Sequence, residues 1–246
     1  ERHPGLVYAR MTGWGQTGPL AGTPGHDLNF TALSGVLSTG RWHGGAPWGP
    51  PTVVGDMGGG GLLLAFGIAC ALLEANQSKR GQVIDASMVE GAMLLAQGLF
   101  NAPGGATKRL LDSSAPFCDV YRCADGRWLS VAPLEPPFFA EFADKLGLAQ
   151  DPDFQPAAQF DSDRWPHMRA KLEGILLAQD RDHWCAHFAG SAACVAPVLE
   201  LDEVPDHPQH RARNAFLDLA GVRQPAPAPR LSRTPASVRR EPPLIG

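Results

Sequence analysis

Four consecutive glycines, Gly58 to Gly61, constrain this chain of 246 residues more than any other feature. They follow Asp56 and open an apolar run, to about Ala75, that reads as a helix. Each glycine costs a helix about 1 kcal/mol relative to alanine, so another requirement must favour bare backbone there. Two explanations are equally open: tight packing of the helix against a sheet, or free N–H groups that face a ligand oxygen.

Strand and helix patterns alternate over the first 115 residues. Residues 6–11 and 81–86 read as strands, residues 27–37 and 88–100 read as helices, and the glycine-led helix lies between them. A long loop rich in Gly and Pro follows the first strand, where backbone can approach a ligand closely. Such alternation is typical of a parallel sheet covered by helices. We therefore predict an α/β fold, with a Rossmann-like doubly wound parallel sheet, for residues 1–115.

The pattern changes from about residue 116. Residues 120–123 and 128–131 flank Asp125 and Gly126, a pair that suits the tight turn of a β-hairpin. Helices are expected over residues 137–146, 162–178 and 181–188, with Asp180 as the cap of the last. We predict a second, smaller α+β domain for residues 116–205, and a segment, 206–246, that returns to the first domain and ends in a Pro-rich tail. Both ends look cut, so we expect an N-terminal part and the extreme C-terminus to be missing.

Composition excludes several classes of protein. A net charge of -4, with 44% hydrophobic and 19% charged residues, is ordinary for a soluble globular domain and gives no basic surface for nucleic acid. The apolar run 62–73 is too short to span a bilayer, and nothing at the start resembles a signal peptide, so we expect a cytoplasmic protein with no membrane partner. Five irregularly spaced cysteines favour reduced thiols. His183 and His187 share a helix face without a third ligand, so no metal is expected.

Two residues stand out as candidates for chemistry on position alone. His26, in Gly25-His26-Asp27, follows the Gly-rich loop at the mouth of a helix, where an imidazole can be exposed to a ligand and yet held in place. Asp56 precedes the glycines. A carboxylate there can cap the helix, or it can act as an acid, a base or a nucleophile beside backbone donors.

Four segments in this order, residues 11–19, 25–30, 55–61 and 80–85, resemble the family III CoA transferases, and within them the α-methylacyl-CoA racemases. The similarity continues through residues 121–127 to about Arg230. Transferases of the family use an aspartate at the place of Asp56 as a nucleophile, whereas racemase-like members carry the Gly-His-Asp found here at residues 25–27. The resemblance therefore implies a racemase or epimerase of 2-methyl-branched acyl-CoA thioesters.

The resemblance also implies roles for individual residues. His26 and Asp56 are the two acid/base groups, and Glu135 is the carboxylate that pairs with His26. Inverting a carbon needs one group to remove a proton from one face and another to deliver a proton to the opposite face, through an enolate-like intermediate. The implied substrate-binding residues are Gly25, Asp27, Leu28, Asn29, Phe30, Gly58 and Gly59. Phe30 and Thr52 differ from the Tyr and Asn that are common in the family.

The implied partners are an acyl-CoA substrate and a second copy of the chain in an interlocked homodimer, with no metal or redox cofactor. One alternative keeps the fold and changes the reaction, to a CoA transferase that moves CoA between carboxylic acids with Asp56 as nucleophile. Another is a binding module without catalysis. Exchange of the α-proton with solvent would distinguish the racemase from both.

Overall fold

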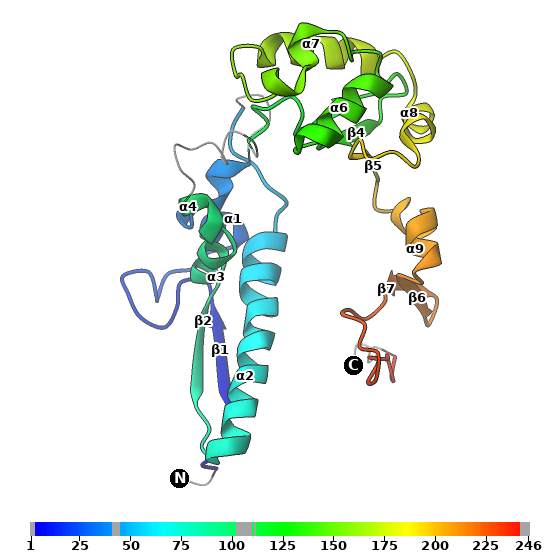
Figure 1. The fold of residues 1–246 in the computed structure, drawn as a ribbon. Coiled ribbons are helices and arrows are strands. Elements are labelled where there is room, and N and C mark those ends of the chain that lie inside the picture. The colour runs from blue at the N-terminus through cyan, green and yellow to red at the C-terminus, as the bar shows by residue number, and fades with distance from the viewer. Residues whose placement is uncertain (1–2, 41–44, 102–109, 111, 242–246) are drawn as a thin grey trace.

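The computed structural model describes residues 3–40, 45–101, 110 and 112–241. In Figure 1 the N-terminal elements form one body, and the elements from β3 to β5 form another above it. The N-terminal body contains β1 (Tyr8–Thr12), α1 (Asp27–Leu33), η1 (Val36–Thr39), η2 (Val53–Leu62), α2 (Leu63–Ser78), β2 (Val83–Ser87), α3 (Met88–Leu95) and α4 (Gln97–Phe100).

The two predicted strands of this body pair in parallel. Their register runs from Tyr8 opposite Val83 to Thr12 opposite Ser87, and η2 and α2 lie on the connection between them. A mixed α/β fold is therefore confirmed. The doubly wound sheet is not clearly seen, because within the described ranges parallel pairing is confined to these two strands. The described residues between the two strands form only helices and loops, so they add no strand to this sheet.

The glycine-led helix begins earlier than predicted. Residues Val53–Leu62 form a π-helix that runs directly into α2, and α3 packs along it. By length and composition, the continuous helix Val53–Ser78 could cross a membrane. Only 17% of the apolar window of this helix is buried in the structure. The apolar run of residues 62–73 had been expected to be too short. A single helix of this kind is weak support for a membrane span, because core helices of soluble proteins pass the same test.

The second body holds an antiparallel sheet and the largest buried core. The predicted hairpin is confirmed as β3 (Asp119–Arg122) and β4 (Trp128–Val131), and β5 (Val195–Val198), which was not predicted, pairs with β4. The three predicted helices are α6 (Pro136–Lys145), α7 (Trp165–Leu176) and α8 (Arg181–Phe188), with short helices η4 (Pro152–Phe154) and η5 (Pro156–Ala158) between the first two. Phe117, Phe139 and Phe142 are fully buried in this core.

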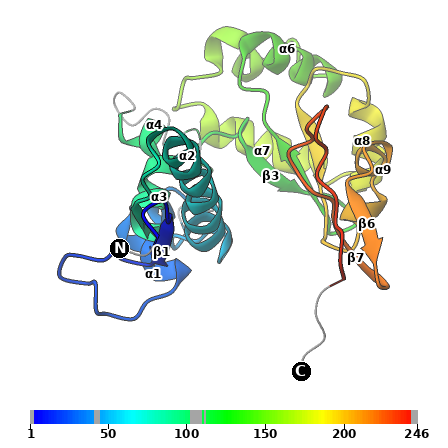
Figure 2. The same cartoon turned by 90° about the horizontal axis from the view of Figure 1, so that it is seen from below.

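The last described elements follow β5 in the chain. They are η6 (Val204–Asp206), α9 (Pro208–Ala212) and the antiparallel pair β6 (Phe216–Leu219) and β7 (Val222–Pro225). Figures 1 and 2 both show α9, β6 and β7 apart from α2. The domain limits given above, and the return of residues 206–246 to the first domain, stay predictions.

Candidate active site

His26 lies at the N-cap of α1, with its backbone extended (φ -131°, ψ 171°) and its side chain exposed. Its backbone N–H donates to Oδ1 of Asn29 over 3.1 Å. Gly25 must precede it as glycine, because a Cβ there would come within 2.8 Å of both Phe30 and Trp14. These two rings pack edge to face with centroids 4.8 Å apart. The hydrogen bond to Asn29 and the packing of Gly25 against the two rings therefore hold the loop that carries the imidazole.

Asp27 joins the His26 loop to the start of the glycine-led helix. Its carboxyl group is buried, and Oδ1 accepts the N–H of Gly55 over 2.7 Å and the N–H of Asp56 over 2.9 Å. Asp27 does not cap its own helix, because His26 occupies the N-cap position of α1. Asp27 instead satisfies unpaired N–H groups of the neighbouring helix, the usual need of a helix start.

Asp56 is the acid that this arrangement positions. Its carboxyl group is half-buried, and burial raises its pKa above the usual value, with a further increase from the charge of Asp27. His26 acts in the opposite direction and lowers the pKa of Asp56. Both neighbours are therefore close enough to exert an electrostatic effect on this carboxyl group. The structure brings together His26 and Asp56, the two residues that the sequence singled out.

Packing accounts for at least part of the glycine run. A Cβ at Gly59 would come within 2.6 Å of the backbone N of Ala92, and a Cβ at Gly91 within 2.0 Å of the carbonyl oxygen of Gly59. Of the two explanations left open by the sequence, close packing holds at Gly59. Three N–H groups of the first helical turn are occupied, since Gly55 and Asp56 donate to Asp27 and Met57 donates to the carbonyl of Thr52 over 3.0 Å. A substrate contact for Gly58 and Gly59 stays a prediction.

The other residues of the Gly25–Phe30 motif mostly support His26. Asn29 holds the His26 backbone, and the buried ring of Phe30 fills the space that a Cβ on Gly13 would need. Leu28 is different, because its side chain is largely exposed. Substrate contacts of Gly25, Asp27, Leu28, Asn29 and Phe30 stay a prediction.

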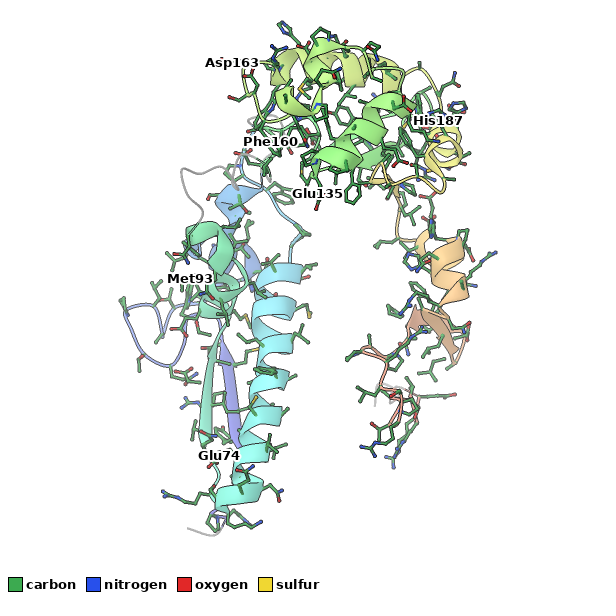
Figure 3. The ribbon with its side chains drawn as sticks, in the orientation of Figure 1. Glu74, Met93, Glu135, Phe160, Asp163 and His187 are labelled. Atoms are coloured by element: carbon green, nitrogen blue, oxygen red, sulfur yellow. The ribbon has the colours of Figure 1, made fainter. Side chains whose placement is uncertain are left out.

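Glu135 lies in the second body, at the N-cap of α6. Figure 3 shows it on the edge of that body that faces the N-terminal elements. Within the described residues, no hydrogen bond or ion pair joins Glu135 to His26. Burial raises the pKa of the Cys194 thiol, and the charge of Glu135 raises it further. The pairing of Glu135 with His26 stays a prediction.

No group of three or more potential metal-binding side chains occurs among the described residues. The rings of His183 and His187 stack with centroids 6.3 Å apart, and Nε2 of His187 lies 2.7 Å from the carbonyl oxygen of Lys145. All five cysteines are free thiols. The two histidine rings on α8 therefore contact each other, and His187 also contacts the backbone of α6.

Comparison with known proteins adds to this geometry. The family model described as CoA-transferase family III matches residues 1–246. The chain is 41% identical to α-methylacyl-CoA racemase of Mus musculus, over 98% of this chain and 65% of that protein. It is 39% identical to the human protein of the same name, with the same coverage. An acetyl-CoA:oxalate CoA-transferase of Acetobacter aceti is 33% identical, over 91% of this chain and 59% of the relative. The chain thus spans 65% of the length of both racemases.

Two solved structures are similar in fold. A CAIB/BAIF family protein from Brucella suis gives a TM-score of 0.77 at 22% identity, over 98% of this chain and 65% of that chain. Rv3272 from M. tuberculosis gives a TM-score of 0.78 at 23% identity, with the same coverage. At this level of identity the likeness concerns the fold alone.

Proposed function

Since the chain belongs to CoA-transferase family III, we propose that it is part of a racemase that interconverts the two configurations of 2-methyl-branched acyl-CoA thioesters. The observation that carries the proposal is that His26 lies near enough to Asp56 for its charge to act on that carboxyl group, while the carboxylate of Asp27 holds the backbone of Asp56. Identity of about 40% to two α-methylacyl-CoA racemases supports the same reaction.

The proposed reaction moves two protons. A neutral His26 imidazole removes the α-proton, and the electron pair of the broken C–H bond passes to the thioester oxygen to give an enolate. A protonated Asp56 then delivers its proton to the opposite face of the same carbon, while the electron pair returns from the oxygen. The reverse direction exchanges the roles of the two groups. The raised pKa of Asp56 supports this assignment, because a carboxyl group that holds its proton more readily can serve as the acid.

A CoA transferase is the second candidate. In that reaction the ionised carboxylate of Asp56 attacks the thioester carbonyl and releases the thiolate of CoA, which leaves an acyl anhydride on the enzyme. Similarity to the acetyl-CoA:oxalate CoA-transferase supports this alternative. The exposed imidazole directly before Asp27 favours the racemase, because the transferase reaction gives it no necessary role. A binding module without catalysis is the third reading.

The test uses the full-length protein in heavy water. A racemase incorporates deuterium at the α-carbon of 2-methylacyl-CoA, and the incorporation is lost in both His26→Gln and Asp56→Asn. A transferase instead gives an acyl or CoA ester that hydroxylamine traps at Asp56, and His26→Gln retains this trapping. If neither signal is found in a folded full-length protein, both enzymatic proposals fail and the binding module is left.

We further propose that the complete protein acts as an interlocked homodimer in the cytoplasm and binds acyl-CoA without a metal or redox cofactor. Family membership and the racemase relatives support acyl-CoA as the substrate class.

A further inference from the structure

Thr52, the residue directly before η2, has a backbone conformation that threonine rarely adopts. Its φ is 67° and its ψ is -18°, in the left-handed region, where a β-branched residue is an outlier. The Thr52 side chain is exposed and makes no capping hydrogen bond, so capping does not offset the strain. Strain of this kind persists only where the surrounding structure imposes it, and it is common at functional sites.

The loop that leads into Thr52 has little freedom. The N–H of Trp48 donates to the carbonyl of Gly40 over 2.8 Å, which ties the loop to the end of η1. The rings of Pro50 and Pro51 fix two further φ angles. The change of direction between this loop and η2 therefore falls on the φ angle of Thr52.

The helix that follows Thr52 starts in the π register. The N–H of Met57 donates to the carbonyl of Thr52 over 3.0 Å, a bond between residues five positions apart. In an α-helix that started at the same residue, this carbonyl would accept the N–H of Asp56 instead. The π register therefore releases the N–H of Asp56, which donates to Oδ1 of Asp27 over 2.9 Å. One extra residue in the first turn thus connects Asp56 to α1.

We propose that Thr52 is a positioning residue, whose left-handed backbone starts η2 in the π register and so holds Asp56 against Asp27. The role belongs to the φ angle and the carbonyl group of Thr52, and its side chain has no part in it. The inference rests on the proposed function, in which Asp56 exchanges a proton with the α-carbon, and adds to it the residue that sets the place of this acid. A displacement of about 1 Å at a reacting group can lower a rate about 100-fold.

The test changes the φ angle that residue 52 can adopt. Proline is locked at about -65°, so Thr52→Pro cannot keep the observed φ of 67°. Within the described chain this substitution removes no backbone hydrogen bond, because the N–H of Thr52 has no acceptor there. We expect kcat for deuterium exchange at the α-carbon of 2-methylacyl-CoA to fall about 100-fold in the full-length protein, with little change in KM.

Two further variants separate the backbone of Thr52 from its side chain. Thr52→Asn should keep the exchange rate and raise the melting temperature, because asparagine adopts the left-handed region more readily than threonine. Thr52→Gly removes the hydroxyl group and adopts the same region freely, so it should also keep the exchange rate. Loss of exchange in Thr52→Gly would show that the side chain acts in the site, and it would overturn the inference.

Lys79→Pro is the matched control at the other end of the same continuous helix. Lys79 directly follows α2, and its φ of 63° is also left-handed. Proline there changes the backbone in the same way and removes the bond from the Lys79 N–H to the carbonyl of Ala75. We expect a melting temperature at least as low as that of Thr52→Pro, with unchanged exchange. Equal losses of exchange in the two variants would mean that exchange only follows stability, which would refute a role in positioning.

A second measurement does not depend on activity. Carbon-13 NMR of labelled aspartate in the full-length protein follows the titration of Asp56, whose pKa is raised by burial and by the charge of Asp27. Thr52→Pro should lower this pKa, because Asp56 leaves the position in which both effects act, and Thr52→Asn should leave the pKa unchanged. If Thr52→Pro does not fold, Thr52→Ile takes its place, because a bulky β-branched residue is poorly tolerated in the left-handed region. It should lower exchange severalfold.

The two measurements distinguish failure of the inference from failure of the proposed function. If the unsubstituted protein exchanges no deuterium, but Thr52→Pro lowers the pKa of Asp56, the racemase proposal fails and the role of Thr52 is retained. Normal exchange in a folded Thr52→Pro protein, with an unchanged pKa of Asp56, would retain the racemase and overturn the inference. Unchanged exchange in Thr52→Ile, where that variant is needed, would overturn it in the same way.

Discussion

At the scale of single residues, one carboxylate oxygen holds two backbone N–H groups together while its charge acts on the neighbouring acid. Asp27 fixes the backbone at Gly55 and Asp56, and it also raises the pKa of Asp56. His26 lowers that pKa. The tendency of Asp56 to hold a proton therefore depends on opposing contributions from two adjacent residues.

Substituting each neighbour should move the titration of Asp56 in opposite directions. Asp27→Asn keeps an acceptor oxygen for the two N–H groups but removes the charge, so we expect the pKa of Asp56 to fall. His26→Gln removes the positive partner, so we expect that pKa to rise. Carbon-13 NMR of labelled aspartate in the full-length protein measures both shifts. Shifts of the same sign would contradict this account of the site.

The raised pKa of Asp56 also has a consequence for stability. A carboxyl group whose pKa is higher in the folded state than its ordinary 3.8 favours folding below that pH and loses this contribution as pH rises through the folded value. At pH 7 the ionised carboxylate of Asp56 therefore slightly lowers the free energy of unfolding, and Asp56→Asn should raise the melting temperature at that pH. The gain should shrink on acidification and vanish below pH 3.8. Thermal unfolding at several pH values checks this, and a gain that grows on acidification would refute it.

The sequence identified His26 and Asp56 because residue type and position are visible in it. The function of Asp27 could not be read in the same way. A carboxylate beside a helix start predicts a cap for that helix, whereas this one binds N–H groups 28 and 29 residues further along the chain. That choice depends on how α1 and η2 pack, which local pattern does not contain. Thr52, the N-cap residue of η2, makes no side-chain hydrogen bond to the helix, and only the structure shows that Asp27 supplies the acceptor instead.

At the scale of elements, local pattern predicted most helices and strands of the first 190 residues but not α9, β6 and β7, and two further differences have an identifiable cause. The helix of η2 starts at Val53, whereas the sequence predicted a start near Met57. The extra turn includes Gly55 and Asp56, whose N–H groups are accepted by Asp27, a residue distant in the sequence. Strand β5 was missed because Pro197 lies inside it. It forms the outer strand of the sheet, where a missing N–H is tolerated.

Two glycines of the same run should respond oppositely to alanine. At Gly59 the new methyl group would press on the backbone of α3, so Gly59→Ala should lower the free energy of unfolding by about 1–3 kcal/mol. At Gly61 it would meet only the carbonyl oxygen of Asp56 at 3.7 Å, so Gly61→Ala should be neutral or stabilise by up to about 1 kcal/mol. Urea unfolding of the full-length protein compares them. Equal losses would mean that packing is not what selects glycine at residue 59.

At the scale of the whole molecule, α2 presents an apolar face that the described residues do not cover. Leu62, Phe66 and Leu73 lie within one face of a continuous helix and are 72%, 65% and 64% exposed. Both edges of the β1–β2 pair are also free within the described chain. Exposed apolar surface on this scale marks an interface. The sequence predicted the apolar helix, but a local pattern does not specify which surface covers such a face.

If a second copy covers that face, as the proposed homodimer requires, a charge at its centre should separate the subunits. Phe66→Glu would bury an unpaired carboxylate in the interface, and we expect it to weaken dimerisation by at least tenfold. Leu177→Glu is the matched control, because Leu177 is 54% exposed and directly follows α7, an element of the second body that Figure 1 shows apart from α2. Sedimentation equilibrium of the full-length variants measures the dissociation constants. A dimer that tolerates Phe66→Glu as well as Leu177→Glu would place the interface elsewhere, and α2 would then be covered by another part of the same subunit.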